Sequence, residues 1–439
     1  MLSFVMLAAC TGTSPAPDTA LAPDSASDPA DTGADNLGGD TSETAEADTA
    51  EEPEDTADDE ADEAAYTALY DVNSVVQVML ELTSADEAAM NAEVEAAIAA
   101  GDDDPEFTYF PAAITVNGAR VDNVGVRVKG GGSVQSWSDK PSIKVKFDAF
   151  VEDTRYAGLK RLTLENMAED PAMCREVLGF HAWREAGMPA PAANFAQVFL
   201  SIDGGTPVAY GLYANVEAMD SRWVSRAFEE DGGDLWEAQD SADFTDRGIG
   251  HFSLVTGDGD AASLDEARDQ LQNHEGDFFD AASDVLDMDA FLQFWTMSVA
   301  IGNRDGYPFH LNDYLVYLHP ADERFAFVPA SMGEGFDSGT PVYGRYVVGT
   351  VGQLCLYYDE DCADRYVAAL NAAISDVEAS DLATFAAASQ VLTDVAVQDD
   401  PRKSWNGEAI TTAQVQAARE TLNARIVAYP ELLREGLGL

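Results

Sequence analysis

Alternation of apolar and polar residues marks several short runs in the first half of the chain. This period of two predicts β-strands, because successive side chains of a strand point to opposite faces. The predicted strands are residues 75–82, 110–116, 121–128, 142–147, 162–164, 196–202 and 208–216. Asn117-Gly118 and Asp203-Gly204-Gly205 have the residue types of tight turns, so they predict two hairpins in this part of the chain.

One helix is predicted among these strands, and more helices follow in the second half. Asp170 is suited to cap the first one, Pro171 fits its first turn, and Gly187 ends it. Further helices are predicted at residues 287–303, 366–375 and 411–433, and a short hairpin at residues 315–317 and 325–328. This order predicts an α+β fold with two lobes, a β-rich lobe with one key helix at about residues 66–217 and a helical lobe at about 218–437.

The N-terminus resembles the signal of a bacterial lipoprotein. An apolar stretch ends in Leu7-Ala8-Ala9-Cys10, and Cys10 would be lipidated, although the basic residues that usually open such a signal are missing. Residues 11–64 contain many acidic and almost no large apolar side chains, so they predict a disordered acidic tether. We therefore expect an exported protein that is lipid-anchored to the bacterial cell envelope, in the periplasm or at the cell surface.

The chain is strongly acidic, with 80 Asp and Glu against 24 Lys and Arg and a formal net charge of −56. Such a charge excludes a general nucleic-acid binder, which needs a basic surface against phosphates. It also disfavours adsorption to an anionic membrane, and no apolar run of about 18 residues predicts a transmembrane helix. We therefore expect a monomer that meets the membrane only through its lipid anchor, with protein partners of neutral or basic surface.

The cysteines fit an exported protein. Cys355 and Cys362 are close enough in the sequence to close a small disulfide loop in an oxidising compartment. Cys174 is expected to be a buried thiol inside the helix that starts near Asp170.

Several enzyme classes lack their signatures here, since the chain has no HExxH, no GxSxG and no GxxxxGK[ST]. Phosphoryl transfer fits better, because it needs a cation for the phosphates, an acid that holds this cation, and carboxylates near the acceptor. Lys144 or Lys146 follows a Gly-rich loop, Glu176 lies on the next helix, and Asp305 and Asn312 follow the long helix. Singly, each also fits a solvent-exposed face or a surface ion pair, and only their order favours function.

Four segments carry a resemblance to a known family. They are residues 125–147 (GVRVKGGGSVQSWSDKPSIKVKF), 162–191 (LTLENMAEDPAMCREVLGFHAWREAGMPAP), 208–220 (VAYGLYANVEAMD) and 301–329 (IGNRDGYPFHLNDYLVYLHPADERFAFVP). In this order they resemble the spore-coat H (CotH) kinase family of atypical secreted protein kinases. The resemblance covers about residues 66–437.

The resemblance implies a two-lobed, atypical protein-kinase-like fold. It also implies transfer of phosphate from ATP, with Mg²⁺ or Mn²⁺, to Ser or Thr of exported or envelope proteins. The residues that match the family's motifs would have these roles: Arg127, Lys129, Lys144 and Lys146 near the phosphates, Glu176 orienting the lysine, Glu217 near the hinge between the lobes, Asp305 as the catalytic aspartate, and Asn312 as a metal ligand.

One departure from the family pattern concerns the metal. The family usually continues after the F-x-P strand with a metal-binding Asp-x-Asp, which is replaced here by Ser331-Met332-Gly333. Mg²⁺ needs carboxylates beside the phosphate oxygens, and Glu334 or Asp337 would have to substitute. The sequence therefore leaves two functions open: an active exported kinase, or a catalytically degenerate surface lipoprotein acting in envelope assembly, adhesion or binding. A wall-binding or carbohydrate-binding protein is a third alternative, although the six Trp are scattered.

Overall fold

The computed structural model describes residues 56–438 except 102–104, 131–133, 231 and 337–346. The chain divides into two units, residues 1–38 and 39–439, and all described residues belong to the second. Cys10, Asp337 and most of the predicted tether lie outside the described residues. The tether was expected to reach residue 64, but a helix, α1 (Thr56–Leu69), begins within it.

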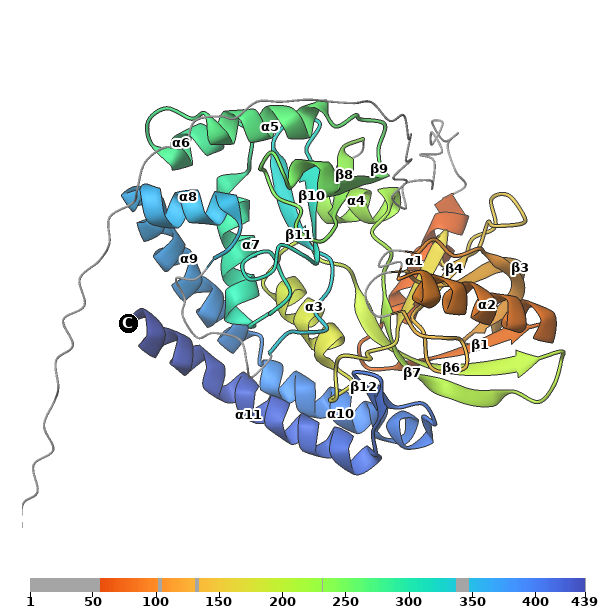
Figure 1. Ribbon diagram of the computed structural model, residues 1–439. Coiled ribbons are helices and arrows are strands. Elements are labelled where there is room, and N and C mark those ends of the chain that lie inside the picture. The colour runs from red at the N-terminus through yellow and green to blue at the C-terminus, as the bar shows by residue number, and fades with distance from the viewer. Residues whose placement is uncertain (1–55, 102–104, 131–133, 231, 337–346, 439) are drawn as a thin grey trace, which may run out of the picture. The chain divides into compact units, whose positions relative to one another are not determined.

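A closed barrel of seven strands forms the first lobe (Figure 1). Its strands are β1 (Val75–Leu82), β2 (Phe110–Val116), β3 (Ala119–Val128), β4 (Ile143–Lys146), β5 (Arg161–Glu165), β6 (Ala193–Ile202) and β7 (Val208–Val216). The order around the barrel is β1-β2-β3-β4-β5-β7-β6, and β1 closes it by pairing in parallel with β6. All seven strands are predicted by the alternating pattern, but the closure is not.

Alternation places one face of each strand inside the barrel. Val126 of β3, Val145 of β4 and Leu162 of β5 are fully buried in its interior. The residues next to each of them along its strand point outward. The turn at Asn117-Gly118 joins β2 and β3 as predicted, and both of its residues have positive φ (48° and 90°), as a two-residue hairpin turn requires.

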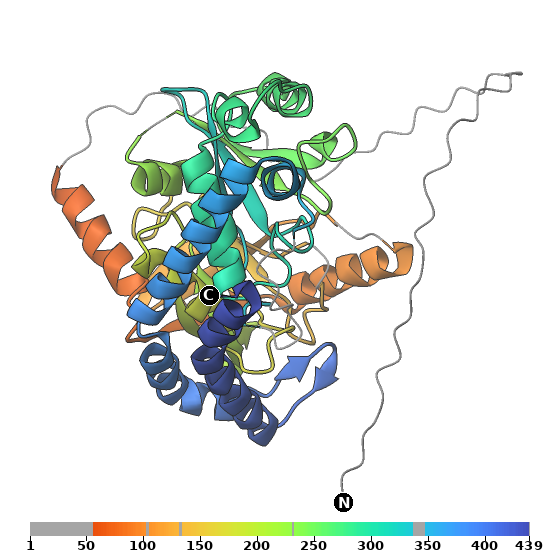
Figure 2. The same ribbon diagram turned by 90° about the vertical axis from the view of Figure 1, so that its left-hand side faces the viewer.

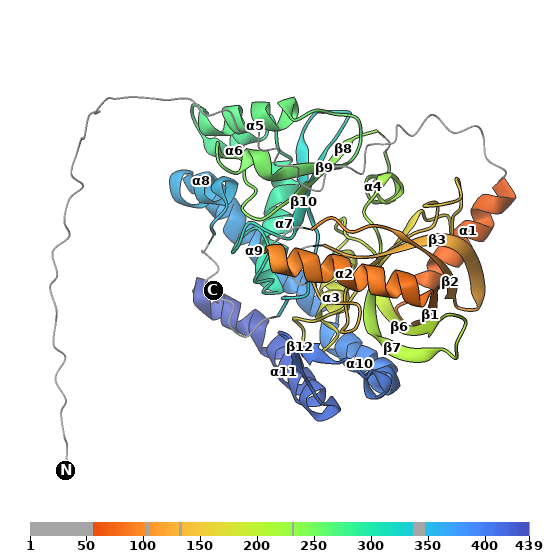
Figure 3. The same ribbon diagram turned by 45° about the vertical axis from the view of Figure 1, so that its right-hand side comes forward.

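The prediction of a single helix among the strands is wrong. Besides α1, a second helix, α2 (Ser84–Ala100), packs against β2 and β3 (Figure 3). Thr83 caps α2 by accepting a hydrogen bond from Asp86 N, and Gly101 ends it in the left-handed region. Only Met90 and Val94 of α2 are buried, so its apolar stripe is too narrow to be recognised by spacing.

The third helix, α3 (Arg175–Glu185), begins later than the sequence predicts. Asp170 is not the N-cap residue of α3, because Cys174 occupies that position. Its carboxylate instead accepts hydrogen bonds from the backbone N–H groups of Ala172, Cys174 and Arg175, and so holds the turn that leads into α3. Cys174 is a buried free thiol, as expected, but it precedes the helix rather than lying inside it. Gly187, with φ +74°, follows the end of α3 as predicted.

The second lobe combines a four-stranded sheet with helices, and the sheet order is β11-β10-β8-β9. Its elements are α4 (Ser221–Phe228), β8 (Asp234–Ala238), η1 (Ile249–His251), β9 (Phe252–Thr256), α5 (Ala262–Gln272), α6 (Phe278–Ala282), α7 (Met288–Ala300), β10 (Tyr314–Leu318), β11 (Phe325–Pro329), α8 (Thr350–Tyr358), α9 (Glu360–Ala379), α10 (Leu382–Asp399), β12 (Ser404–Trp405), β13 (Glu408–Ala409) and α11 (Thr412–Leu437). The α+β class with a β-rich and a helical lobe is therefore confirmed.

The predicted helices and hairpin of this lobe are found as α7, α9, α11 and β10–β11, whereas α10 is not predicted. Thr411 and Gln414, whose spacing predicts a capping box, form one at the start of α11. Helices α10 and α11 lie side by side, and the hairpin β12–β13 precedes α11 (Figure 2). In the described part of the chain, no helix combines the length and the apolar character needed to cross a membrane.

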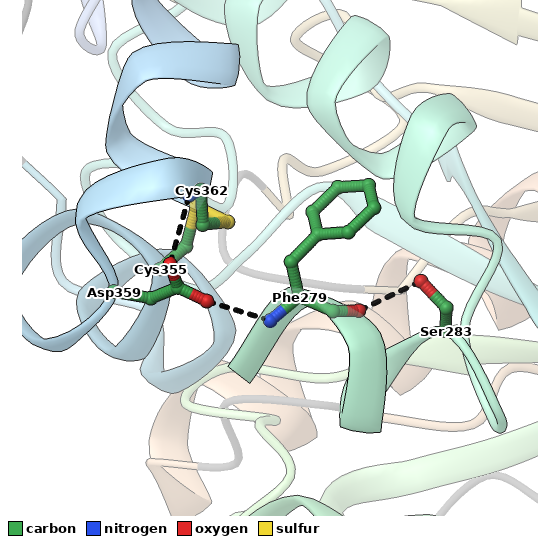
Figure 4. Close-up of a disulfide and its surroundings, with 5 residues drawn as sticks. All are labelled: Phe279, Ser283, Cys355, Asp359 and Cys362. Atoms are coloured by element: carbon green, nitrogen blue, oxygen red, sulfur yellow. Dashed lines mark hydrogen bonds between the residues drawn. A yellow bond between two sulfur atoms is a disulfide. The ribbon is translucent and has the colours of Figure 1, made fainter. Parts of the chain in front are cut away.

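The predicted disulfide between Cys355 and Cys362 is confirmed and links α8 to α9 (Figure 4). In the sequence, Asp359 lies between the two cysteines. One of its carboxylate oxygens accepts a hydrogen bond from Cys362 N (3.0 Å) and the other from Phe279 N (2.9 Å). The same carboxylate therefore caps α9 and binds the first turn of α6.

A buried ion pair connects the barrel to the C-terminal helices. Lys140, before β4, places its Nζ 2.8 Å from Asp400 Oδ2 at the end of α10, and the two side chains are 3% and 0% exposed. The same oxygen accepts a hydrogen bond from Leu212 N in β7 (2.9 Å). Burial lowers the pKa of Lys140, although Asp400 opposes this shift.

The ion pair gives a stability prediction. Asp400→Asn leaves the Lys140 ammonium buried beside a neutral group, so we expect a loss of about 3–5 kcal/mol in the free energy of unfolding. Adding Lys140→Met removes the unpaired charge and should restore most of this loss, as measured by urea unfolding. The exposed pair Arg434–Glu378 provides the control, since Glu378→Ala should cost about 1 kcal/mol or less. An Asp400→Asn loss no larger than that of the control would contradict the prediction.

Candidate active site

The outward face of β3, β4 and β5 carries the predicted cations. Arg127 of β3 lies opposite Lys144 of β4, and Lys144 lies opposite Thr163 of β5. Arg127 is 5% exposed, and its guanidinium carbon lies 5.1 Å from the ring centroid of Tyr109, a geometry typical of a cation–π contact. Because facing residues of neighbouring strands lie close together, these side chains form one polar strip on the barrel.

Lys129 lies at the end of this strip and forms an ion pair that the sequence does not predict. Its Nζ is 2.5 Å from Oε1 of Glu165 on β5. Burial lowers the pKa of Lys129, but the carboxylates of Glu165, Glu237 and Glu176 raise it more, so its pKa lies above the ordinary value. Burial raises the pKa of Glu165, but Lys129, Ser142 and Lys144 lower it more, so it lies below the ordinary value. Lys129 and Glu165 therefore both carry their charges at neutral pH.

The other two predicted lysines lie at different distances from this ion pair. Lys144 is close enough to Glu165 to lower its pKa. Lys146 lies opposite Arg161, four strand positions from Glu165, which is about 13 Å along β5. Of the candidates for the phosphate-binding lysine, Lys129 and Lys144 are thus near the carboxylates of the site, and Lys146 is remote.

Glu176, in the first turn of α3, joins the barrel side of the site to the segment after β11. Its Oε2 accepts hydrogen bonds from Met332 N (2.8 Å) and Ser331 Oγ (3.2 Å). A Cβ at Gly179 would lie 2.4 Å from the Cβ of Met332, so glycine at this position of α3 lets the segment approach closely. Ser331 and Met332, which stand in place of the family's Asp-x-Asp, thus bind the glutamate of α3.

Glu176 is buried, and this changes its ionisation. Burial and the nearby charge of Glu165 raise its pKa to about 8, although the hydrogen bond from Met332 N, the charge of Lys129 and the hydrogen bond from Ser331 oppose the shift. Glu176 is therefore protonated at neutral pH. The sequence-based expectation was a glutamate that orients Lys144 or Lys146, whereas the lysine that influences it here is Lys129.

The structure brings Asp305 and Asn312 together, as their spacing suggests. Asn312 Nδ2 donates a hydrogen bond to Asp305 Oδ2 (3.2 Å), and His310 Nδ1 lies 3.4 Å from Asp305 Oδ1. Burial and the charge of Glu334 raise the pKa of Asp305, while Asn312, His310 and Arg304 lower it, and the net shift is upward. The Asp305 side chain remains 26% exposed, so a substrate can reach it.

Two further carboxylates belong to this group and are missed by the sequence analysis. Burial, together with Asp305 and Glu176, raises the pKa of Asp313 well above the ordinary value, and Lys129 opposes the shift. Burial, Glu334 and Asp305 also raise the pKa of Glu169. Asp313 directly follows Asn312 in the sequence and lies two residues before the predicted strand 315–317, so no spacing rule identifies it.

Glu334 contributes charge to the site but is already paired. Arg304 donates to both of its carboxylate oxygens, from Nε (2.8 Å) and from Nη2 (2.5 Å). Asn303 at the end of α7 donates a hydrogen bond to Ser331 O (3.1 Å), which fixes the segment after β11 beside Asp305. Among the described residues, no group of three or more His, Cys, Asp or Glu side chains has the arrangement needed to hold a metal ion.

Glu217 lies outside this group and is fully engaged elsewhere. Its carboxylate forms an ion pair with Arg226 of α4 and accepts hydrogen bonds from Tyr66 of α1 (2.9 Å) and Ala192 N (3.0 Å). It follows β7 and so lies at the passage from the barrel to the second lobe. These contacts indicate that Glu217 holds α1 and α4 to this passage, and they leave its predicted nucleotide role without support.

The lysine and carboxylates gathered from β3, β5, α3 and the segments around β10 and β11 are typical of a kinase-like protein. In a comparison with known families, the family model described as CotH kinase protein matches residues 126–343. This match confirms the resemblance of the sequence motifs. It extends from β3 through β11, and so contains every residue of the group described above.

Solved structures and curated proteins were also compared. The chain is similar to the crystal structure of a Helicobacter pylori proinflammatory kinase, CtkA, with 6% sequence identity and a TM-score of 0.32. The alignment covers 68% of this chain and 92% of that chain. No curated protein sequence matches the chain.

The raised pKa of Glu176 gives a prediction for stability against pH. Because its folded pKa of about 8 exceeds the ordinary 4.5, the unfolded chain loses this proton first, so the contribution of Glu176 to stability declines as the pH rises between these values. We expect Glu176→Gln to gain about 1 kcal/mol per pH unit relative to the wild type over this window, as measured by urea unfolding at pH 5, 6, 7 and 8. Glu185→Gln, at an exposed position of the same helix, should show no such trend. A parallel pH dependence of Glu176→Gln and wild type would show that Glu176 is ionised in the fold.

Proposed function

We propose that this protein is an exported CotH-type kinase that transfers phosphate from ATP to Ser or Thr hydroxyls of secreted or envelope proteins. The observation that carries the proposal is the gathering of Asp305, Asn312 and Asp313 around one loop, next to the buried Glu176 and the charged Lys129. Phosphoryl transfer depends mainly on positioning and on neutralising phosphate charge; Lys129 would supply the positive charge, and Asp305 would position the acceptor hydroxyl.

Lys129 is our candidate for the phosphate-binding cation. It keeps its charge because the surrounding carboxylates raise its pKa, and Glu165 fixes its ammonium group in one position. Lys144 and Arg127 lie on the same outward face of the barrel. A strip of fixed positive charge can bind the phosphates of a nucleotide in a chain that is otherwise strongly acidic.

The residues present also fit a divalent metal ion. Mg²⁺ is usually held by one or two carboxylates together with waters and phosphate oxygens, so a cluster of three protein carboxylates is not required. The charge of Asp305 raises the pKa of the buried Asp313, and a nearby cation would offset this repulsion. Asp313 and Asn312 would hold the ion, which would neutralise charge on the transferred phosphate.

Asp305 would then act on the acceptor hydroxyl. A carboxylate with a raised pKa is a better proton acceptor than an ordinary one, and it must reach the proton within hydrogen-bonding distance. Asn312 orients the carboxylate of Asp305 through a hydrogen bond. The ion pair of Arg304 and Glu334 lies beside this carboxylate. We infer that the acceptor enters from the solvent-exposed side of Asp305.

Loss of Asp305 tests the catalytic proposal. We expect Asp305→Asn to lower the rate of phosphate transfer to protein, or of autophosphorylation, by about 100-fold or more, because it removes the proton acceptor. The measurement uses radiolabelled ATP with Mg²⁺ or Mn²⁺. Asp246→Asn, at an exposed position of the second lobe, is the control and should retain full activity. Equal activity of Asp305→Asn and wild type would refute the catalytic role of Asp305.

Lys129 and Lys146 give a separate prediction for nucleotide binding. We expect Lys129→Met to raise the dissociation constant of ATP by about 10- to 100-fold, the effect of losing one charged hydrogen bond. Lys146→Met should change it by less than about twofold, because Lys146 is remote from the carboxylates. Titration with a fluorescent ATP analogue measures both variants. If Lys146→Met weakens binding as much as Lys129→Met, the placement of the phosphates is wrong.

A second candidate function rests on Ser331 and Met332. Since these residues bind Glu176 through a hydroxyl and a backbone N–H, the segment supplies no carboxylate where the family usually has two. The alternative is therefore a catalytically degenerate surface protein that binds nucleotide and acts in envelope assembly or adhesion. Nucleotide binding without Mg²⁺-dependent turnover, unchanged in Asp305→Asn, would favour this alternative.

A further inference from the structure

A buried arginine of α11 connects segments that are far apart in the sequence. Arg419 is only 1% exposed. Its Nη1 donates hydrogen bonds to Gln390 O (3.1 Å) and Asp394 Oδ1 (3.0 Å), and its Nη2 donates to Thr393 Oγ1 (2.7 Å), all on α10. Its Nε donates to Ala172 O (3.0 Å), in the turn that precedes α3. One side chain therefore joins both C-terminal helices to the start of α3.

The turn before α3 has a conformation that needs support from its surroundings. Met173 is not a glycine but has φ +54°, and such a residue keeps a left-handed backbone only where neighbouring contacts enforce it. Ala172 is fully buried. Its N–H donates to Asp170 Oδ1 (2.8 Å), and its carbonyl accepts from Arg419. Since a buried carbonyl that loses its donor is costly, the turn depends on both of these side chains.

This turn sets the position of Glu176, which follows Ala172 by four residues. Oε2 of Glu176 accepts a hydrogen bond from the N–H of the fully buried Met332 (2.8 Å). Helix α10 also packs directly against α3 (Figure 1), and there the ring of Phe385 stacks on His181 with 3.6 Å between the ring centroids. Both α10 and α11 lie beyond residue 343, where the family match ends. The support of α3 thus comes from a part of the chain outside that match.

We propose that Arg419 is a positioning residue of the active site: through Ala172 O it fixes the start of α3, and so holds the carboxyl group of Glu176 against the N–H of Met332. In protein kinases, the placement of the helix that carries the glutamate controls activity. Here a pair of helices from the same chain holds that helix. The placement of Glu176 stands by itself, whereas its effect on phosphate transfer rests on the proposed function.

Two substitutions of Arg419 separate the bond to Ala172 from the other bonds of the guanidinium group. Lysine has a methylene group where arginine has Nε, so Arg419→Lys loses the bond to Ala172 O but keeps a positive charge near Asp394. Glutamine has its amide nitrogen at the position of Nε, so Arg419→Gln keeps a donor for Ala172 O but loses the charge. If Arg419 only stabilised the helix pair, Arg419→Lys would be the milder change.

Hydrogen exchange at the amide of Met332 reports the contact with Glu176 directly. The full chain is labelled with ¹⁵N-methionine, and among its 11 Met the Met332 signal is assigned by its loss in Met332→Leu. The amide of Met297, inside α7, is the internal reference for general unfolding. In Arg419→Lys, we expect the ratio of the Met332 to the Met297 exchange rate to rise by about 10-fold, the effect of losing one buried hydrogen bond. In Arg419→Gln, it should stay within about threefold of the wild type.

Asn423→Ala is the matched control on α11. The side-chain amides of Asn423 and Gln390 exchange two hydrogen bonds of 2.9 Å and so join α11 to α10 without reaching Ala172. This variant should keep the wild-type exchange ratio. An unchanged ratio in Arg419→Lys would overturn the proposal, and so would an equal rise in Arg419→Gln or Asn423→Ala. Each Arg419 variant is decisive alone, so the test survives if one of them does not fold.

Phosphate transfer is measured on the same variants. We expect kcat to fall by about 10-fold in Arg419→Lys and to be largely restored in Arg419→Gln, while the dissociation constant of ATP changes by less than about twofold in both. If the exchange ratios behave as expected but the wild type transfers no phosphate, the proposed function fails and the placement of Glu176 stands. Full transfer by Arg419→Lys despite faster exchange at Met332 would overturn the role of Arg419 in catalysis.

Discussion

The buried carboxyl group of Glu176 is the point on which the arrangement of the site depends. Through one oxygen it binds a backbone N–H and a hydroxyl of the segment after β11, and through its position on α3 it lies beside the lysine of the barrel. Burial and the nearby charge of Glu165 disfavour a charged carboxylate there, and the two hydrogen bonds and the charge of Lys129 offset them only in part. Protonation removes that cost, so the geometry of the site rests on a neutral acid.

The remaining charges of the site follow from this arrangement. The positive charge of Lys129 is balanced by Glu165, Glu237 and Glu176, and the charge of Asp305 raises the pKa of the buried Asp313. Buried like charges are unfavourable unless a cation or a proton intervenes. Under the proposed function, a metal ion would offset the charge of these carboxylates, and the phosphates of ATP would pair with Lys129.

Much of the fold could be predicted from the sequence, because strand alternation and turn residues are local signals. All seven barrel strands, the helix with Gly187 at its end and the Cys355–Cys362 bridge were accessible in this way. Closure of the barrel and the helices α2 and α10 were not, since they depend on tertiary packing rather than on a strong apolar period. The site was predicted in part: Asp305 and Asn312 meet, but Glu165 and Asp313 are recognised only once distant segments are brought together.

The parallel pairing of β1 with β6 has a consequence for synthesis of the chain. Val75 is paired with Phe195, so the first strand to leave the ribosome finds its second neighbour only after about 120 further residues have been made. Until then the growing sheet presents open strand edges, which readily pair with other chains. Fragments that stop before β6 should therefore be prone to aggregation, and useful truncation of this protein has to keep both strands.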